Sequence, residues 1–206
     1  MSESWSAKRK EIVFQFLIVL VGVDPLVWRR IRVPGGYSFW DLHVAIQDVM
    51  GWLDYHLHEF KLNEPHSGKQ IRIGMPDDED LYGMKVLPDH LIPISDYFVY
   101  ENEVALYTYD FGDGWRHLVV FEDWIQPEKG VQYPQCISGE RKCPPEDCGG
   151  TVGYTRFLEA IQNVDHEEHE KYLTWIGGRF DHNEFSLDQI RFDDPAERWR
   201  VAFEEP

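Results

Sequence analysis

The chain has 206 residues, of which 43% are hydrophobic, so it is long enough to bury a sizeable core and too apolar to remain disordered. Its formal net charge of −17 at pH 7 would repel a phosphate backbone, which disfavours general binding to DNA or RNA. An acidic, aromatic-rich surface instead suits a protein partner.

The N-terminal segment superficially resembles a signal peptide, because basic residues at 8–10 precede an apolar run at 12–23. However, Glu11 and Gln15 interrupt the pattern, no small-residue cleavage site follows, and the run is shorter than the roughly 20 residues that span a bilayer. The sequence therefore predicts a flexible N-terminus at 1–10 and a cytoplasmic protein with no membrane segment. Its three cysteines are then expected to be reduced thiols or metal ligands.

Two strands are predicted first. Residues 12–21 place large apolar side chains on both faces, which is typical of a strand covered on both sides. Residues 27–33 form the second strand, where alternation places Arg30 and Arg32 on one face and Arg29 on the other. We interpret these arginines as partners for acidic side chains rather than as an anion site.

The clearest helix begins at Phe39. Ser38 and Asp41 have the spacing of a capping box, an apolar stripe follows with helical periodicity, and Gly51 ends the helix. Further strands are predicted at 55–62, 70–73, 104–110 and 115–122, and further helices at 151–163, at 165–175 and from 195 onward. The acidic run at 77–80 is expected to be a solvated loop, and 127–150 a long loop. The pattern predicts an α+β fold, with a single domain at 11–206 and a mixed, largely antiparallel sheet covered by helices.

Histidines in the third strand form the first candidate site. Strand alternation would place His56 and His58 on one face, a spacing that can offer two nitrogens to one metal ion. Hydrogen-bonded histidines at a sheet edge explain the pattern equally well.

The hairpin at 104–122 is the second candidate. If Asp110 lies opposite Trp115, Thr108 faces His117, and the carboxylate and the imidazole share a face. Such a pair can fix the tautomer of the histidine for metal binding or proton transfer, with Asp113 nearby. A purely structural tight turn explains these residues equally well, because glycines flank Asp113.

Cysteines supply the third candidate. Cys136, Cys143 and Cys148 lie within thirteen positions of a long loop that needs some tie to become ordered. Three thiolates could hold a zinc ion if a histidine or carboxylate completed the tetrahedron. The alternative is that they are ordinary buried packing residues, since the spacing matches no common zinc-finger pattern.

Several longer motifs occur together in this chain: DPLVWRRI at 24–31, FWDLHVAIQ at 39–47, GWLDYHLHEF at 51–60, YDFGDGWRH at 109–117 and CPPEDCGG at 143–150. Together they resemble the plasmid pRiA4b ORF-3-like family, over roughly residues 11–190. The resemblance implies an α+β domain, encoded in some cases on plasmids or mobile elements, whose biochemical role is not established.

Three classes of function remain open. A binding or interaction module leads, because no catalytic template is complete. The second is a metal-assisted hydrolase, which requires one concave site. That site would join His43, His56 or His58 with Asp110, Asp113 and His117. The third is an accessory protein of a plasmid or mobile element, which in a DNA-acting form predicts duplex binding that strengthens at low salt.

Overall fold

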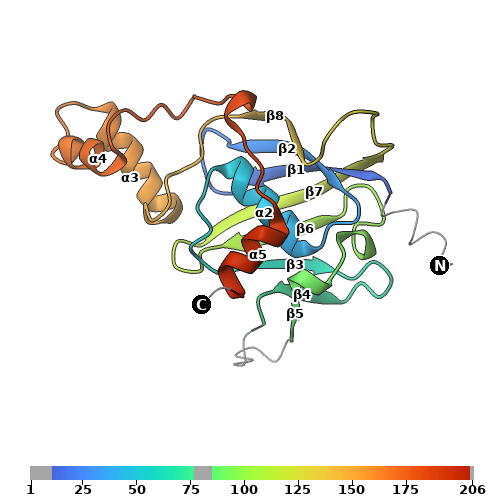
Figure 1. The fold of residues 1–206 in the computed structure, drawn as a ribbon. Coiled ribbons are helices and arrows are strands. Elements are labelled where there is room, and N and C mark those ends of the chain that lie inside the picture. Colours follow the sequence, from blue (N-terminus) through green and yellow to red (C-terminus); the bar gives the residue numbers. More distant parts are fainter. Residues whose placement is uncertain (1–10, 77–84, 205–206) are drawn as a thin grey trace.

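The computed structural model describes residues 11–76 and 85–204 and contains one eight-stranded sheet with the order β5-β4-β3-β6-β7-β1-β2-β8 (Figure 1). The strands are β1 (Val13–Leu20), β2 (Trp28–Pro34), β3 (His58–Asn63), β4 (Gln70–Gly74), β5 (Val86–Pro88), β6 (Val104–Tyr109), β7 (Trp115–Ile125) and β8 (Gln135–Glu140). Neighbouring strands are antiparallel except for the parallel pair β4 and β5. The predicted α+β class with a mixed, largely antiparallel sheet is confirmed. The predicted flexible N-terminus at 1–10 and the acidic run at 77–80 lie outside the described residues.

Helix α2 (Phe39–Met50) forms as the sequence predicts. The Ser38 hydroxyl accepts a hydrogen bond from the Asp41 backbone N–H at 3.2 Å, and the Asp41 carboxylate accepts one from the Ser38 N–H at 2.8 Å. At the other end Gly51 adopts φ 76°, a left-handed conformation that glycine tolerates without a Cβ clash. The capping box and the glycine therefore fix both ends of this helix.

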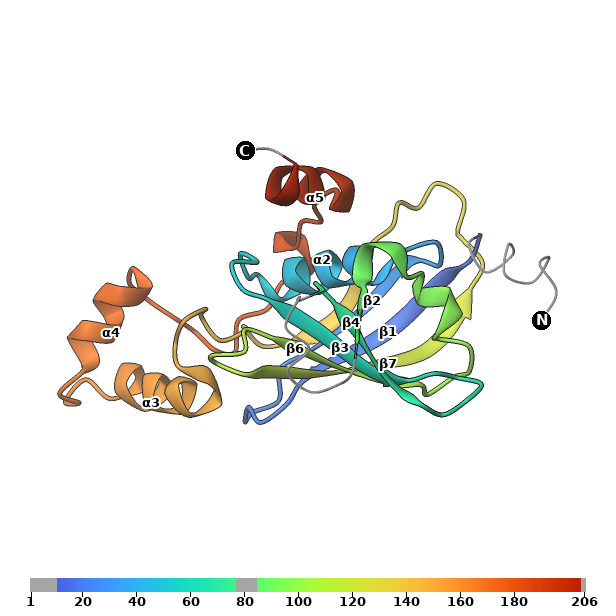
Figure 2. The same ribbon diagram turned by 90° about the horizontal axis from the view of Figure 1, so that it is seen from below.

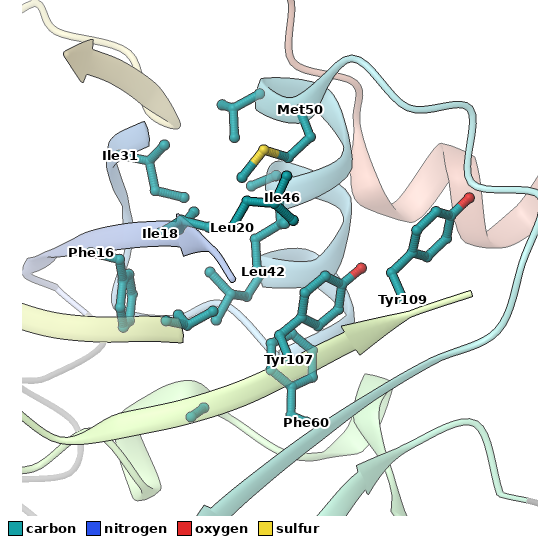
Figure 3. Close-up of a cluster of buried hydrophobic side chains, with 14 of the residues drawn as sticks. Phe16, Ile18, Leu20, Ile31, Leu42, Ile46, Met50, Phe60, Tyr107 and Tyr109 are labelled. Carbon is teal, nitrogen blue, oxygen red and sulfur yellow. The ribbon is translucent and has the colours of Figure 1, made fainter. Parts of the chain in front are cut away.

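The main core lies between α2 and the sheet (Figure 3). Phe16, Ile18 and Leu20 point from β1 toward Leu42 and Ile46 of the helix, and all five side chains are fully buried. Each such side chain contributes about 1.5–3 kcal/mol through burial. This packing anchors α2 across the middle of the sheet.

The opposite face of β1 is only partly covered, so the prediction of a strand buried on both sides is wrong. Leu17 and Val19 are half-buried there. Among the described helices, α2 and α5 lie together on the other side of the sheet (Figure 2). Apolar side chains on both faces of a strand do not show whether each face is fully buried or only half-buried.

The arginines of β2 lie on the predicted faces, and two of the three pair with acidic side chains as predicted. Arg30 and Arg32 lie on the half-covered face and form ion pairs with Glu122 at 2.7 Å and Glu128 at 3.3 Å. Arg29 points to the other side and is buried. The two half-buried arginines are therefore used within the fold, whereas Arg29 donates to backbone carbonyls and has no acidic partner of the kind predicted.

The remaining helices are α3 (Gly150–Gln162), α4 (His169–Ile176) and α5 (Pro195–Phe203), with short 3-10 turns at Asp89–Leu91, Ile94–Asp96 and Leu187–Gln189. Helices α3 and α4 lie beside the sheet as a small lobe (Figure 1), where Phe157 packs edge-on against Tyr172 and Trp175. Helix α5 lies over α2 (Figure 2). Within the described part of the chain, no helix combines the length and the apolar character needed to cross a membrane.

Three predicted boundaries are wrong. The predicted loop at 127–150 contains β8, which pairs with β2 and forms the edge of the sheet. The helix expected from Asp165 begins at His169, because the Asn163 side chain accepts a hydrogen bond from the Asp165 N–H and holds the preceding residues in a turn. The strand expected from Tyr55 begins at His58, since the Tyr55 N–H donates to the Tyr109 hydroxyl instead of joining a ladder.

Candidate functional site

Three loops meet at one end of the sheet. They comprise residues 51–57 after α2, residues 110–114 between β6 and β7, and residues 143–150 before α3. The Leu53 N–H donates to Glu146 at 2.8 Å, and the Gly149 N–H donates to Asp113 at 3.0 Å. We call the face that these segments form the loop surface. Three of the five motifs that carry the family resemblance converge on it.

His56, Asp110 and Asp147 form a polar cluster at the centre of the loop surface. The His56 Nε2 atom lies 3.1 Å from Asp147 Oδ1 and 3.7 Å from Asp110 Oδ2. One donor atom from each residue lies within 4.8 Å of the other two, and these are the residues of the described ranges that could jointly hold a metal ion. Two predicted candidates, His56 and Asp110, are therefore brought together, with Asp147 as an unexpected third member.

The surroundings of this cluster are acidic. Asp113 belongs to the neighbouring turn, and the charge of its carboxylate acts on the Cys148 thiol. Burial raises the pKa of the Cys148 thiol to about 12, and the charges of Asp113 and Asp147 add to this effect. Burial, together with the hydrogen bond to Glu146, also raises the pKa of Tyr109. The local potential therefore disfavours additional negative charge.

Exposed apolar side chains lie on the same loops as the acidic cluster. Leu53, Tyr55, Leu57 and Phe111 are between 56% and 72% exposed. Exposed apolar residues that stand singly are ordinary, but four on adjoining loops are typical of an interaction surface. We call these four residues the apolar rim.

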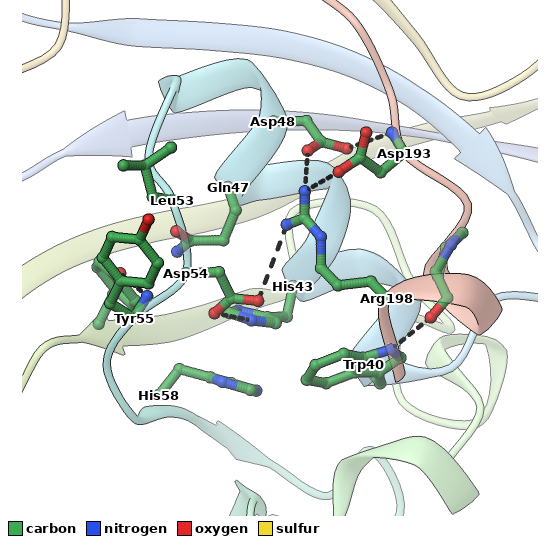
Figure 4. Close-up of polar contacts among 12 residues, drawn as sticks. Trp40, His43, Gln47, Asp48, Leu53, Asp54, Tyr55, His58, Asp193 and Arg198 are labelled. Atoms are coloured by element: carbon green, nitrogen blue, oxygen red, sulfur yellow. Dashed lines mark hydrogen bonds and ion pairs between the residues drawn. The ribbon is translucent and has the colours of Figure 1, made fainter. Parts of the chain in front are cut away.

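His58 belongs to a different, buried cluster (Figure 4). Its ring stacks on His43 with centroids 3.5 Å apart, and its Nε2 atom lies 2.9 Å from Asp89. His43 in turn contacts the Tyr107 hydroxyl at 2.7 Å and Asp54 at 2.8 Å. Burial, with the charge of His58 as the second cause, lowers the pKa of His43 to about 4. The prediction that His56 and His58 share a face is wrong, because His56 precedes the strand.

His117 is also separated from the acidic cluster. The predicted register is wrong by one residue: Tyr109 lies opposite Trp115, so Thr108 faces Arg116 and His117 faces Tyr107. The cause is the turn, where Asp110 adopts φ 54° and leaves the ladder. His117 consequently points into the core and is fully buried.

The structure does not bring the three cysteines together. Cys136 lies on β8 near the Ser138 carbonyl, and Cys143 is buried against Met50 and Arg29, at 3.1 Å and 3.3 Å. Burial raises the pKa of both thiols to about 11, so neither is a thiolate at neutral pH. These surroundings give no support to the expected zinc site and fit the alternative of packing residues.

Sequence reasoning missed Asp147 and the apolar rim. Asp147 lies in the CPPEDCGG motif, whose cysteines were the residues predicted to bind a metal ion. The sequence predicts a strand at 55–62, which includes Tyr55 and Leu57, and in a strand these two side chains share a face that would be buried. Apolar residues occur at every second position from 53 to 57, but this spacing alone does not distinguish a loop from a strand.

Comparison with known proteins matches residues 12–189 to the family described as plasmid pRiA4b ORF-3-like protein. The chain is 32% identical over 191 residues to an uncharacterised protein of Sinorhizobium fredii, y4hQ, covering 91% of this chain and 94% of that protein. It is also similar to the crystal structure of a protein of unknown function, MM3350 from Methanosarcina mazei Go1. That similarity has a TM-score of 0.82 and 42% identity, and it covers 88% of this chain and 99% of that one. The chain therefore belongs to the plasmid pRiA4b ORF-3-like family.

Proposed function

We propose that this protein is an interaction module that binds a protein partner on the loop surface. The observation that carries the proposal is the apolar rim, whose four exposed side chains lie on the two loops that also carry His56 and Asp110. Protein interfaces commonly combine aromatic and aliphatic contacts with a few polar groups that fix orientation. Tyr55 and Phe111 would supply the aromatic contacts.

The distribution of the candidate residues favours binding over hydrolysis. A hydrolase would need its histidines and acids in one concave site. His58 and His117 are instead buried in separate surroundings, away from His56. The cavity of about 540 Å³ beside the end of α2 is lined by residues such as Trp52 and Cys143 and by none of the six histidines and aspartates of the hydrolase hypothesis.

The charge of the loop surface indicates the chemistry of the partner. Asp110, Asp113, Glu146 and Asp147 all belong to its loops, and the whole chain carries a net charge of −17. A second copy of this chain would bring like charges together, which costs affinity. The partner that fits is a protein segment carrying both cationic and apolar side chains.

Selection from a phage-displayed library of random peptides tests this proposal. Enriched peptides should combine Lys or Arg with apolar residues, and the double variant Tyr55→Ser/Phe111→Ser should weaken their binding at least tenfold. Val164→Ser, at a 77% exposed site between α3 and α4, is the matched control and should leave binding unchanged. Absence of enrichment, or equal binding by the double variant, would overturn the proposal.

A further inference from the structure

We infer that His56, Asp110 and Asp147 form a binding site for one divalent transition-metal ion, for which zinc is the test ion. The inference goes beyond the proposed function, because the ion can bind whether or not a partner does. It also differs from the zinc site expected at the cysteines, since it uses an imidazole and two carboxylates. Such mixed donors are common ligands of zinc.

The spacing of the donor atoms suits a single ion. Zinc bonds to nitrogen and oxygen ligands at about 2.0–2.2 Å, so two ligands of a tetrahedral site lie roughly 3.3 Å apart. The two distances from His56 Nε2, 3.1 Å to Asp147 and 3.7 Å to Asp110, bracket this value. Three protein ligands would leave one coordination position open.

Asp110 supplies an independent observation. Its residue is only 7% exposed, and its Oδ1 atom accepts hydrogen bonds from the backbone N–H groups of Gly112 and Asp113. Within the described ranges Oδ2 accepts no hydrogen bond, and it faces His56 at 3.7 Å. Because the backbone holds Oδ1, the Oδ2 atom is left to bind a cation beside His56 and Asp147.

The local charge also favours a cation. The His56 imidazole faces two carboxylates, and the carboxylate of Asp113 lies on the neighbouring turn. The ring of His56 packs edge-on against Tyr109 with centroids 5.8 Å apart, which holds it in place. Metal binding here would need little movement of these side chains.

A bound ion would tie together the three segments of the loop surface. His56, Asp110 and Asp147 come from different loops, separated by 54 and 37 residues in sequence. These ligands come together only in the folded chain, so the ion binds the folded state in preference to the unfolded state, and the free energy of binding adds to the free energy of unfolding. Zinc should therefore raise the thermal stability of the whole protein.

Isothermal titration of the metal-free full chain with zinc chloride tests the inference. We expect one saturable site with a dissociation constant in the micromolar range or below, and a higher melting temperature in zinc. His56→Gln and Asp147→Asn should each weaken binding at least tenfold. Cys148→Ser should bind zinc normally, which distinguishes this site from one built on thiols.

The outcomes separate this inference from the proposed function. Tyr55→Ser/Phe111→Ser should still bind zinc, because neither side chain is a proposed ligand, whereas peptide binding can be measured in the presence of a chelator. Circular dichroism will show whether each variant is folded, and His56→Gln is the decisive variant because its side chain is partly exposed. Absence of saturable binding, retention of binding by folded His56→Gln, or loss of binding in folded Cys148→Ser would overturn the inference.

Discussion

His117 is a buried histidine whose lowered pKa makes the free energy of unfolding depend on pH. Its imidazole packs against Trp52 and Tyr107, each with a centroid distance of 5.3 Å, and burial lowers its pKa to about 3 against a weaker opposing effect of the Tyr107 backbone. His43 behaves similarly, with a pKa of about 4. In the unfolded chain both would titrate near 6.5.

The sign of the effect follows from these values. Below about pH 6.5 the unfolded chain binds protons that the folded chain does not, so the stability present at pH 7 is lost as pH falls toward 4. We predict that His117→Leu, which keeps a similar volume, makes this loss shallower and changes stability at pH 7 by less than about 1.5 kcal/mol. Urea unfolding followed by tryptophan fluorescence between pH 4 and 7 measures both quantities.

The matched control for this prediction is His66→Leu, at an exposed position. It should leave the pH dependence as in the original protein. An unchanged slope in His117→Leu would contradict the conclusion that the buried imidazole resists protonation.

Arg29 is the residue on which several elements depend. Its guanidinium donates to the Val49, Trp28, Glu140 and Arg141 carbonyls at 2.7–2.9 Å and lies 4.3 Å from the centroid of the Phe185 ring. It thereby joins β2, the end of α2 and the end of β8. Lysine has the charge but not the planar fork of donors.

We therefore predict that Arg29→Lys lowers the free energy of unfolding by roughly 3 kcal/mol, because hydrogen bonds to charged groups contribute about 1.5–3 kcal/mol each and several are lost. Arg32→Lys is the control, since its ion pair with Glu128 is largely exposed and worth at most about 1 kcal/mol. Urea denaturation at pH 7 compares the two. Equal losses in both variants would show that the buried network is dispensable.

At the scale of elements, the sequence was most informative where the local signals agree. Helix α2 has a capping box, an apolar stripe and a terminal glycine, and the structure confirms its start and end. Strand β8 has no such signals: residues 135–139 are half-buried without alternation and Glu140 is exposed, and the segment forms a strand because β2 offers it an unpaired edge. Pairing with a distant edge is a tertiary effect that a local pattern does not contain.

The sequence identified part of the candidate site, but not how its residues come together. His56 and Asp110 were identified from their residue types and motifs, but their meeting with Asp147 depends on how three loops pack. The pairing of Asp110 with His117 failed because one residue of register moves a side chain to the opposite face of a sheet. Turn length, which set that register, depended on the left-handed conformation of Asp110.

Helix α5 has no buried residue, and aromatic contacts together with the ion pair of Arg198 with Asp48 hold it against the rest of the fold. Trp199 packs edge-on against Trp40 at 5.1 Å and lies over His90 at 4.2 Å, while the Trp40 indole donates to the Pro195 carbonyl at 2.9 Å. Elements that bury little surface open more readily than the core. We predict that Trp199→Ala exposes α5 to proteolysis while lowering the melting temperature only slightly.

Limited proteolysis followed by mass spectrometry measures this release. The variant should lose residues beyond Asp193 at least tenfold faster than the original protein, with the remainder intact. Val201→Ala, at a position 54% exposed on the same helix, should behave as the original. Uniform degradation of Trp199→Ala would instead show that α5 supports the whole fold.

At the scale of the whole molecule, the excess of acids leaves few cations available to a nucleic acid. Of the arginines on β2, Arg29 is buried, and Arg30 and Arg32 are paired with Glu122 and Glu128. Affinity for duplex DNA arises mainly when Lys and Arg displace counterions condensed on phosphates. A surface with a net charge of −17 and paired arginines would repel DNA more strongly as salt is lowered.

We therefore predict no binding to duplex DNA in a gel-shift titration at about 20 mM salt, the condition that most favours electrostatic binding. The double variant Glu122→Gln/Glu128→Gln frees Arg30 and Arg32 and changes the net charge from −17 to −15, since it removes two negative charges. It should also fail to bind, because two released cations do not offset the remaining acids. A retarded band that disappears as salt rises to about 200 mM would show that the chain contacts phosphates, and would restore the DNA-acting form of the accessory-protein hypothesis.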